Sequence, residues 1–223
     1  MFDEALGLLT TIGAPVYVAL LLVSIAATAT VIYKIVQYAQ MGVGRRAAAN
    51  AAMARWRSGD GDAAMRQAAA DRSGLCRVMS ATMASLLSDP ASQDRARDLG
   101  THEAIQILNA ITKNLRVLEA VVQAAPMLGL LGTVIGMIKA FAALSQGGGA
   151  VDPGALAGGI WVALLTTAVG LAIAIPFYFL SVWLEGRVEG ERSAMELAIE
   201  GLIQAQVGWR LQAAEGAASR AYS

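Results

Sequence analysis

The stretch GGIWVALLTTAVGLAIAIP, residues 158–176, decides the fold. It lies within Pro153 to Leu184, 32 residues that contain no Asp, Glu, Lys or Arg. Trp161 and Trp183 lie near the two ends, where indole side chains favour the interface between lipid and water. A helix needs about 20 mainly apolar residues to cross the hydrocarbon core of a bilayer. The stretch therefore predicts a transmembrane helix.

Two other stretches have the same character. Ala5 to Tyr33 holds 29 residues without a charge, from which we predict a span from Val16 to Val36, and Ala120 to Ile138 holds 19. The composition agrees, because 56% of the 223 residues are hydrophobic and 15% are charged, whereas soluble domains carry about 25% charged residues. We predict an all-α membrane protein with three transmembrane helices.

The distribution of Lys and Arg predicts the orientation. None precedes the first span, 12 lie from Lys34 to Arg116, one is Lys139, and four follow from Arg187 onward. Cytoplasmic segments keep the positive residues. We therefore expect the N-terminus outside, a long cytoplasmic insert, an outside hairpin at SQGGGAVDPG (145–154), and the C-terminus inside.

The insert is rich in helix-forming residues and is interrupted by SGDGD (58–62) and LSDP (87–90). This pattern predicts helices over 34–57 and 61–87, with Asp62 as a helix cap. The second membrane helix is expected to extend far into the cytoplasm, as is the third. Each extension carries an apolar stripe through which the two can pair. The stripes are Ile105, Leu108, Ile111, Leu115, Leu118 and Val122, and Leu184, Val188, Met195, Ile199 and Leu202.

The second and third spans each carry one face of small residues and a threonine. These faces are Ala125, Gly129, Thr133, Gly136 and Ala140, and Gly159, Ala163, Thr167, Gly170 and Ala174. One interpretation is tight helix packing, with each threonine bonded to its own helix. The other places the hydroxyls along a pore. Three helices cannot surround a lumen, so the pore interpretation also predicts a homo-oligomer.

Several classes of function lack the residues that they need. Cys76 is the only cysteine, His102 is the only histidine, and Asp60 and Asp62 have no further ligands at useful spacing. We expect no metal site, no cofactor and no enzyme activity. A net charge of zero without runs of like charge argues against binding to nucleic acid.

The two phrases APMLGLLGTVIGMIKAF (125–141) and GGIWVALLTTAVGLAIAIP together resemble the MotA/TolQ/ExbB proton-channel family, especially its ExbB and TolQ branch. The resemblance covers essentially the whole chain. It implies a multi-pass protein of the bacterial inner membrane, a homo-pentamer around a central pore. The pore would hold single-span helices of an ExbD/TolR-like partner, and proton flow through that partner's aspartate would drive motion passed to a TonB/TolA-like protein.

The resemblance also implies a set of site residues, and the spans, breaks and charge distribution described above divide the chain into segments. Thr133 and Thr167 would present hydroxyls to the pore, on faces shared with Gly129, Gly136, Ala163 and Gly170. The expected segments are a periplasmic N-terminus with the first span (1–36), a cytoplasmic insert (37–89), a long helix with the second span (90–145), a periplasmic hairpin (146–158), the third span with its cytoplasmic extension (159–217), and a tail (218–223).

The chain departs from the family pattern at Val162, where ExbB and TolQ proteins usually carry a glutamate. An intramembrane carboxylate is costly and usually functional. Its loss leaves two alternatives open, a MotA-like stator subunit and a non-conducting scaffold for partner helices. Glu119 is the nearest acid, either paired with Arg116 at the interface or part of a cytoplasmic ion exit.

Overall fold

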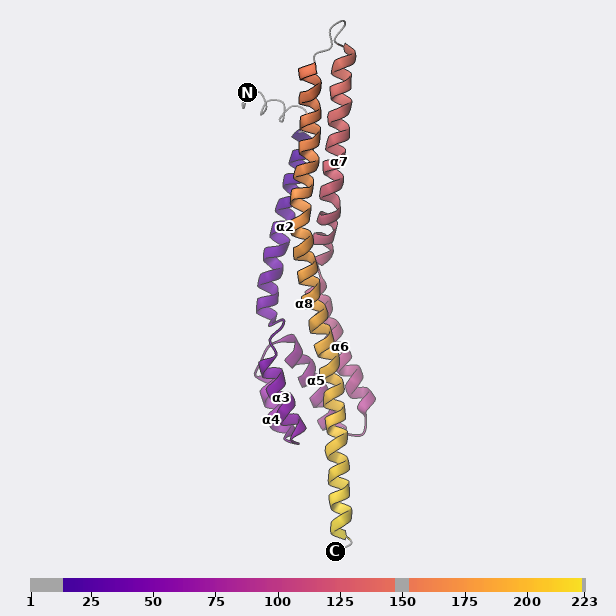
Figure 1. Cartoon of the computed structure of the whole chain (residues 1–223). Coiled ribbons are helices and arrows are strands. Elements are labelled where there is room, and N and C mark those ends of the chain that lie inside the picture. Colours follow the sequence, from indigo (N-terminus) through magenta and orange to yellow (C-terminus); the bar gives the residue numbers. More distant parts are fainter. Residues whose placement is uncertain (1–13, 147–152, 222–223) are drawn as a thin grey trace. The chain divides into compact units, whose positions relative to one another are not determined.

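A computed structural model describes residues 14–146 and 153–221, and every element within them is a helix. The helices, labelled in Figure 1, are α2 (Ala14–Met41), α3 (Ala47–Arg57), α4 (Gly61–Ala69), α5 (Gly74–Ser88), α6 (Gln93–Thr112), α7 (Leu115–Gln146) and α8 (Pro153–Ala221). The all-α class is thereby confirmed. The predicted N-terminal segment before residue 14, the centre of the predicted hairpin (147–152) and residues 222–223 lie outside the described residues.

Three helical stretches are long and apolar enough to cross a membrane, which confirms the three predicted spans. They are Pro15–Met41, Gln93–Ala142 and Leu156–Leu211. The second and third stretches are longer than a bilayer requires, and the uncharged part of each is the part suited to lipid. The chain divides into two compact units. The first unit contains residues 1–33 and 114–183, and the second contains residues 34–113 and 184–223.

The first unit has a narrow core of small and branched side chains. Val16 and Leu20 of α2 pack with Ala125 of α7 and Ala174 of α8. Large apolar side chains point outward instead, among them Leu21, Leu22, Leu130, Leu164 and Phe179. An apolar exterior suits a unit whose solvent is lipid, because lipid tails are as apolar as leucine.

The second unit has a core like that of a soluble helical domain. Trp56 of α3 is completely buried, and its indole N–H donates to the Leu202 carbonyl of α8 at 2.8 Å. Its ring meets Trp209 edge to face, with 5.1 Å between centroids. Burial of apolar side chains around this pair provides the main driving force for folding of the unit. The buried side chains include Ala52, Leu75, Cys76, Val78, Met79, Met83, Leu86, Ile107, Met195, Ile199, Leu202 and Ile203.

Two helices predicted in the insert are interrupted. The helix expected over 34–57 stops at Met41 and resumes at Ala47, because Gly42 and Gly44 adopt positive φ values of 66° and 86°, which favour glycine. The helix expected over 61–87 is divided at residues 70–73, where Ser73 has an extended backbone and caps α5.

The cap of α4 also differs from the prediction. Asp62 was the expected cap, but the Asp60 side chain accepts the Ala63 N–H at 3.0 Å. The prediction of Asp62 is therefore wrong. The helix begins at Gly61, one residue after Asp60, so Asp62 lies inside its first turn.

The long helix predicted over 90–145 is also divided, between α6 and α7. Lys113 leaves the helical region of backbone space, and Asn114 has a φ of 70°. Asparagine tolerates this left-handed conformation better than most residues, and it commonly follows a helix C-terminus. Residues 91–125 contain no proline and no pair of glycines that would have marked the break.

Side chains of α2 bind the end of α6 that this break creates. The last carbonyls of a helix have no partner within the helix and carry partial negative charge. The Lys34 ammonium donates to the Ile111 carbonyl at 2.8 Å, and the Tyr38 hydroxyl donates to the same oxygen at 3.3 Å. Gln37 donates to the Ala110 carbonyl at 3.1 Å. Lys34 is completely buried. It therefore takes part in packing within the second unit, besides being one of the positive residues that predict the orientation.

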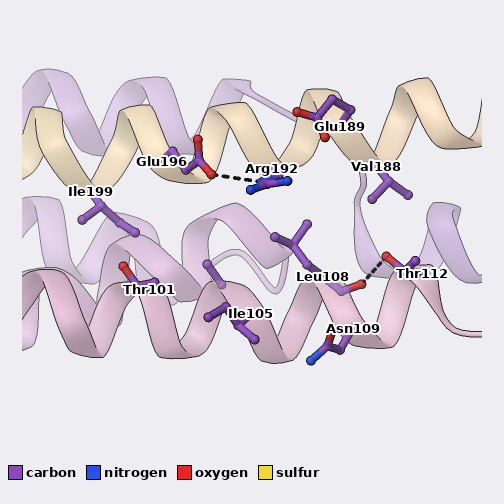
Figure 2. A pocket seen from close by; sticks show the side chains of 11 residues that line it. Thr101, Ile105, Leu108, Asn109, Thr112, Val188, Glu189, Arg192, Glu196 and Ile199 are labelled. Atoms are coloured by element: carbon purple, nitrogen blue, oxygen red, sulfur yellow. Dashed lines mark hydrogen bonds and ion pairs between the residues drawn. The ribbon is translucent and has the colours of Figure 1, made fainter.

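Helices α6 and α8 pair in the second unit, as their stripes predicted in part. Leu184, Met195, Ile199 and Leu202 are buried, which confirms four of the five residues predicted for the stripe of α8, whereas Val188 is half-buried. On α6 the buried residues include Ile107 and Ile111, whereas Ile105 is 51% exposed. Ile105 lies in an open groove of about 360 Å³ between the two helices (Figure 2).

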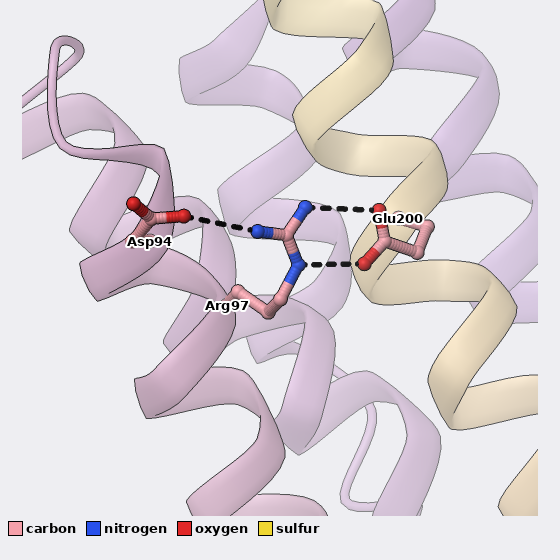
Figure 3. Close-up of polar contacts among 3 residues, drawn as sticks. All are labelled: Asp94, Arg97 and Glu200. Carbon is pink, nitrogen blue, oxygen red and sulfur yellow. Dashed lines mark hydrogen bonds and ion pairs between the residues drawn. The ribbon is translucent and has the colours of Figure 1, made fainter.

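A charged contact also joins these two helices (Figure 3). The Arg97 guanidinium of α6 donates to both carboxylate oxygens of Glu200 of α8, at 2.7 and 3.2 Å, and to Asp94 at 3.2 Å. The hydrogen bond from Arg97 holds the pKa of Glu200 below its ordinary value. A bidentate arginine pair fixes the orientation of the two helices as well as their separation.

Candidate functional site: the contact between α7 and α8

The predicted site residues lie at a close contact between α7 and α8 in the first unit. Small residues make this contact possible, because a side chain at several glycines would collide with the opposite helix. A Cβ at Gly136 would lie 2.8 Å from the Ala163 Cβ, and a Cβ at Gly170 would lie 2.6 Å from the Ala125 carbonyl oxygen. The two backbones therefore approach more closely than larger residues would permit.

Four of the six predicted pathway residues are buried in this contact. They are Gly129, Gly136, Ala163 and Gly170. Their positions agree with the packing interpretation of the small-residue faces. The assignment of these residues to an ion pathway stays a prediction.

The two adjacent threonines of α8 share one acceptor on α7. The Thr167 hydroxyl donates to the Gly129 carbonyl at 3.1 Å, and the Thr166 hydroxyl approaches the same oxygen at 3.2 Å. Thr166 also donates to the Ala163 carbonyl of its own helix at 2.6 Å. Thr167 is half-buried, whereas Thr166 is 1% exposed. Thr166, which is not among the predicted site residues, is therefore the more deeply buried of the two threonines.

Helical spacing contained a signal for Thr166. It lies four residues after Val162, so the two side chains share one face of α8. A Cβ at Gly132 would lie 2.5 Å from the Thr166 Oγ1, which shows that the glycine makes room for the hydroxyl. Gly132 and Gly136 have the spacing G-x-x-x-G, which favours close approach of a second helix but does not identify that helix.

Thr133 lies outside the closest part of the contact. Its hydroxyl donates to the Leu130 carbonyl of its own helix at 2.6 Å, and its side chain is half-buried. It lines a shallow, mainly apolar hollow on α7 with Val134, Met137, Ile138 and Phe141. The contact therefore does not bring Thr133 and Thr167 into a shared hydrogen bond within one chain.

The two positions relevant to acid chemistry differ in their surroundings. Val162 is 5% exposed, so a carboxylate there would be buried. Glu119 is exposed in the first turns of α7, and the described residues include no ion pair between it and Arg116. Glu119 is also the only acid of the first unit within its described residues.

No group of three or more His, Cys, Asp or Glu side chains that could hold a metal occurs within residues 14–146 and 153–221. The polar groups at the contact are the threonine hydroxyls and the backbone carbonyls that accept from them. Neither kind of group titrates near neutral pH.

Comparison with known proteins identifies the family. Residues 70–197, more than half of the chain, match the model of the MotA/TolQ/ExbB proton channel family. The chain belongs to this family. The matched segment contains α7, most of α8 and every predicted site residue, from Glu119 to Gly170.

Curated relatives confirm the resemblance to the ExbB branch of the MotA/TolQ/ExbB family. The chain is 44% identical over 90 residues to the putative biopolymer transport protein ExbB homolog of Methanothermobacter thermautotrophicus, which is 40% of this chain and 31% of that protein. It is 38% identical over 95 residues to biopolymer transport protein exbB1 of Vibrio cholerae, 40% of this chain and 42% of the relative. It is 42% identical over 80 residues to biopolymer transport protein ExbB of Helicobacter pylori, 35% of this chain and 54% of the relative.

These matches cover between about a third and about half of the relatives' lengths. Together with the three apolar helices, they establish the chain as a multi-pass membrane protein of the family.

Proposed function

We propose that the chain is an ExbB/TolQ-like subunit of a bacterial inner-membrane motor. Its N-terminus lies in the periplasm, and its second unit lies in the cytoplasm. Five copies surround a pore that holds the single-span helices of an ExbD/TolR-like partner. Proton flow through the partner drives motion that a TonB/TolA-like protein transmits for outer-membrane transport or envelope maintenance.

The observation that carries this proposal is the α7–α8 contact inside the segment that matches the family. The Thr166 and Thr167 hydroxyls bind the Gly129 carbonyl across the contact, and the described part of the first unit contains no acid except the exposed Glu119. A pore lined by these helices would offer polar groups but no carboxylate that could hold a proton. The titrating carboxylate then belongs to the partner. Thr133 and Thr167 donate to carbonyls of the chain but are only half-buried, so their hydroxyl oxygens remain available as acceptors toward the pore.

Proton uptake tests the role of the hydroxyl. Vesicles containing the chain and its single-span partner are loaded with a pH-sensitive dye, and a membrane potential is imposed. Thr167→Val, which removes the hydroxyl but keeps the shape, should reduce proton uptake to background, whereas Thr167→Ser should retain it. Thr28→Val is the matched control, because the Thr28 hydroxyl donates to the Ser24 carbonyl of its own helix on α2. Normal uptake by Thr167→Val, with the oligomer intact, would refute the assignment.

A second candidate function is favoured by the buried valine. If Val162 replaces a required carboxylate, the chain is a scaffold that binds partner helices without conducting ions. The scaffold predicts that wild-type vesicles bind the partner and show no proton uptake even with a potential imposed. Uptake by the wild type would exclude the scaffold.

A further inference from the structure

The outer side of α8 in the second unit carries glycines that packing within the chain does not explain. Gly186 and Gly190 are exposed, and a Cβ built at either would meet nothing within 4 Å. Glycine is less favourable than alanine inside a helix, so its use on an open face needs a reason outside the single chain. Leu197 lies on the same side of the helix and is 73% exposed. These features indicate a surface that another backbone approaches closely.

Two grooves of opposite charge lie on nearly opposite sides of α8, as its 3.6-residue turn requires. The acidic groove lies between α6 and α8, with Ile105 on its wall (Figure 2). Glu189 and Glu196 line it together with Arg192, which is paired with Glu196 at 3.1 Å, so the groove keeps a net negative charge.

The basic groove, about 250 Å³, lies between α3 and α8 beside Leu197. Arg46 and Arg57 line it, and no acid is among the residues that line it. Arg46 also pairs with the buried Glu191 at 3.3 Å, which neutralises part of its charge and holds its guanidinium at this edge of α8. Arg57 gives the basic groove a net positive charge, as Glu189 gives the acidic groove a net negative one, so the two grooves are complementary in charge.

We propose that a second copy of this chain occupies these grooves in a head-to-tail contact, with the basic side of one second unit packed against the acidic groove of the next. Two different surfaces that complement each other generate a closed ring when the rotation between copies closes. This inference rests on the homo-oligomer of the proposed function, and it names the surface that the copies use outside the membrane spans.

The levels of the residues along α8 agree with a ring. Neighbouring copies in a ring are related by rotation alone and are not shifted along the ring axis. A residue of one copy can therefore meet only those residues of the next copy that lie at the same height, which is measured here along α8. Arg46 donates to the Gly190 carbonyl, so it lies at the level of Glu189 in the next copy. Figure 2 shows Thr101 near Ile199 at one end of the acidic groove and Thr112 near Val188 at the other, with Ile105 between these ends beside Glu196 and Arg192.

Leu197 directly follows Glu196, so it is within about one helical turn, roughly 5.4 Å, of the level of Ile105. Within one chain the two side chains lie on different sides of α8, because Leu197 lines the basic groove and Ile105 the acidic one. A link between them has to join two copies.

Cysteine cross-linking of the full chain in membranes tests the contact. The only native cysteine, Cys76, is buried, and burial raises the pKa of its thiol, so it contributes little background. A mixture of the single variants Leu197→Cys and Ile105→Cys should form covalent dimers under mild oxidation. The double variant should form a ladder that ends at the size of the intact ring.

The matched control is Leu211→Cys combined with Ile105→Cys. Leu211 is 60% exposed on α8 but lies 14 residues beyond Leu197, about 21 Å along the helix, so this pair should not cross-link. Self-linking of Leu197→Cys alone would overturn the head-to-tail contact. An intact oligomer by native mass spectrometry without a ladder would also overturn it, whether or not protons flow. A ladder without proton uptake would support this surface and contradict the proposed function.

Discussion

Replacing Gly132 with alanine should separate α7 from α8. A Cβ at this position would lie 2.5 Å from the Thr166 Oγ1 and 2.7 Å from the Thr166 Cβ. Ordinary contacts between heavy atoms are about 3.5–4.0 Å, so the helices must move apart by about 1 Å. The hydrogen bonds from Thr166 and Thr167 to the Gly129 carbonyl, now 3.2 and 3.1 Å, would then be lost.

The cost follows from these contacts. Overpacking costs about 1–3 kcal/mol, and a hydrogen bond between membrane helices contributes about 0.6 kcal/mol. We therefore expect Gly132→Ala to be about 2–4 kcal/mol less stable than Gly158→Ala, its matched control. A Cβ at Gly158 would meet nothing within 4 Å, and the control cancels the gain in helix propensity that both variants share.

The assay is the free energy of unfolding of the full chain in bicelles, measured by steric trapping or by titration with a denaturing detergent. Thr166→Ala in the Gly132→Ala background removes the Oγ1 and the methyl group but keeps the Cβ, so it should restore part of the lost stability. Equal stability of Gly132→Ala and Gly158→Ala, within about 0.5 kcal/mol, would refute the close contact as the reason for the glycine.

Three further predictions concern the second unit. Lys34→Met should lower the free energy of unfolding by about 1–3 kcal/mol, because the Ile111 carbonyl at the end of α6 loses a buried donor. Lys113 is exposed, so the control variant Lys113→Met should change the free energy of unfolding little in the same assay. Because Arg97 lowers the pKa of Glu200 in the folded state, their contact stabilises fully above the ordinary pKa near 4.5 and is lost as the pH falls through the lower folded value. In a Glu200→Gln variant the melting temperature should therefore fall less between pH 6 and pH 3 than in the wild type. The same pH profile in both proteins would contradict the contribution of this contact. Cys76 should react with maleimide at the rate of unfolding, whereas rapid labelling of the folded chain would show that it is accessible.

The sequence contained enough to predict the class, the three spans and the family. Each depends on local properties, namely the length of uncharged stretches and the order of residues in two phrases. The small faces of α7 and α8 were also visible from spacing, since residues three and four apart share a helix face. Spacing does not say which face of which helix lies opposite, so it could not separate packing from a pore.

Breaks between helices needed the tertiary structure. Asn114 takes a left-handed conformation, and the carbonyls freed at the end of α6 are satisfied by Lys34, which is distant in sequence. No local pattern contains that compensation, because the free energy of the break depends on a partner supplied by another helix.

The same distinction applies to the paired threonines of α8. The sequence by itself determined that residues 158–176 form an apolar helix with two hydroxyls on it. Only the tertiary structure decided that both hydroxyls meet the carbonyl of Gly129 and that Thr166 is the more buried. The physical reason is that helix formation depends on neighbours along the chain, whereas the partner of a hydroxyl depends on which backbone can approach closely enough to accept its hydrogen bond.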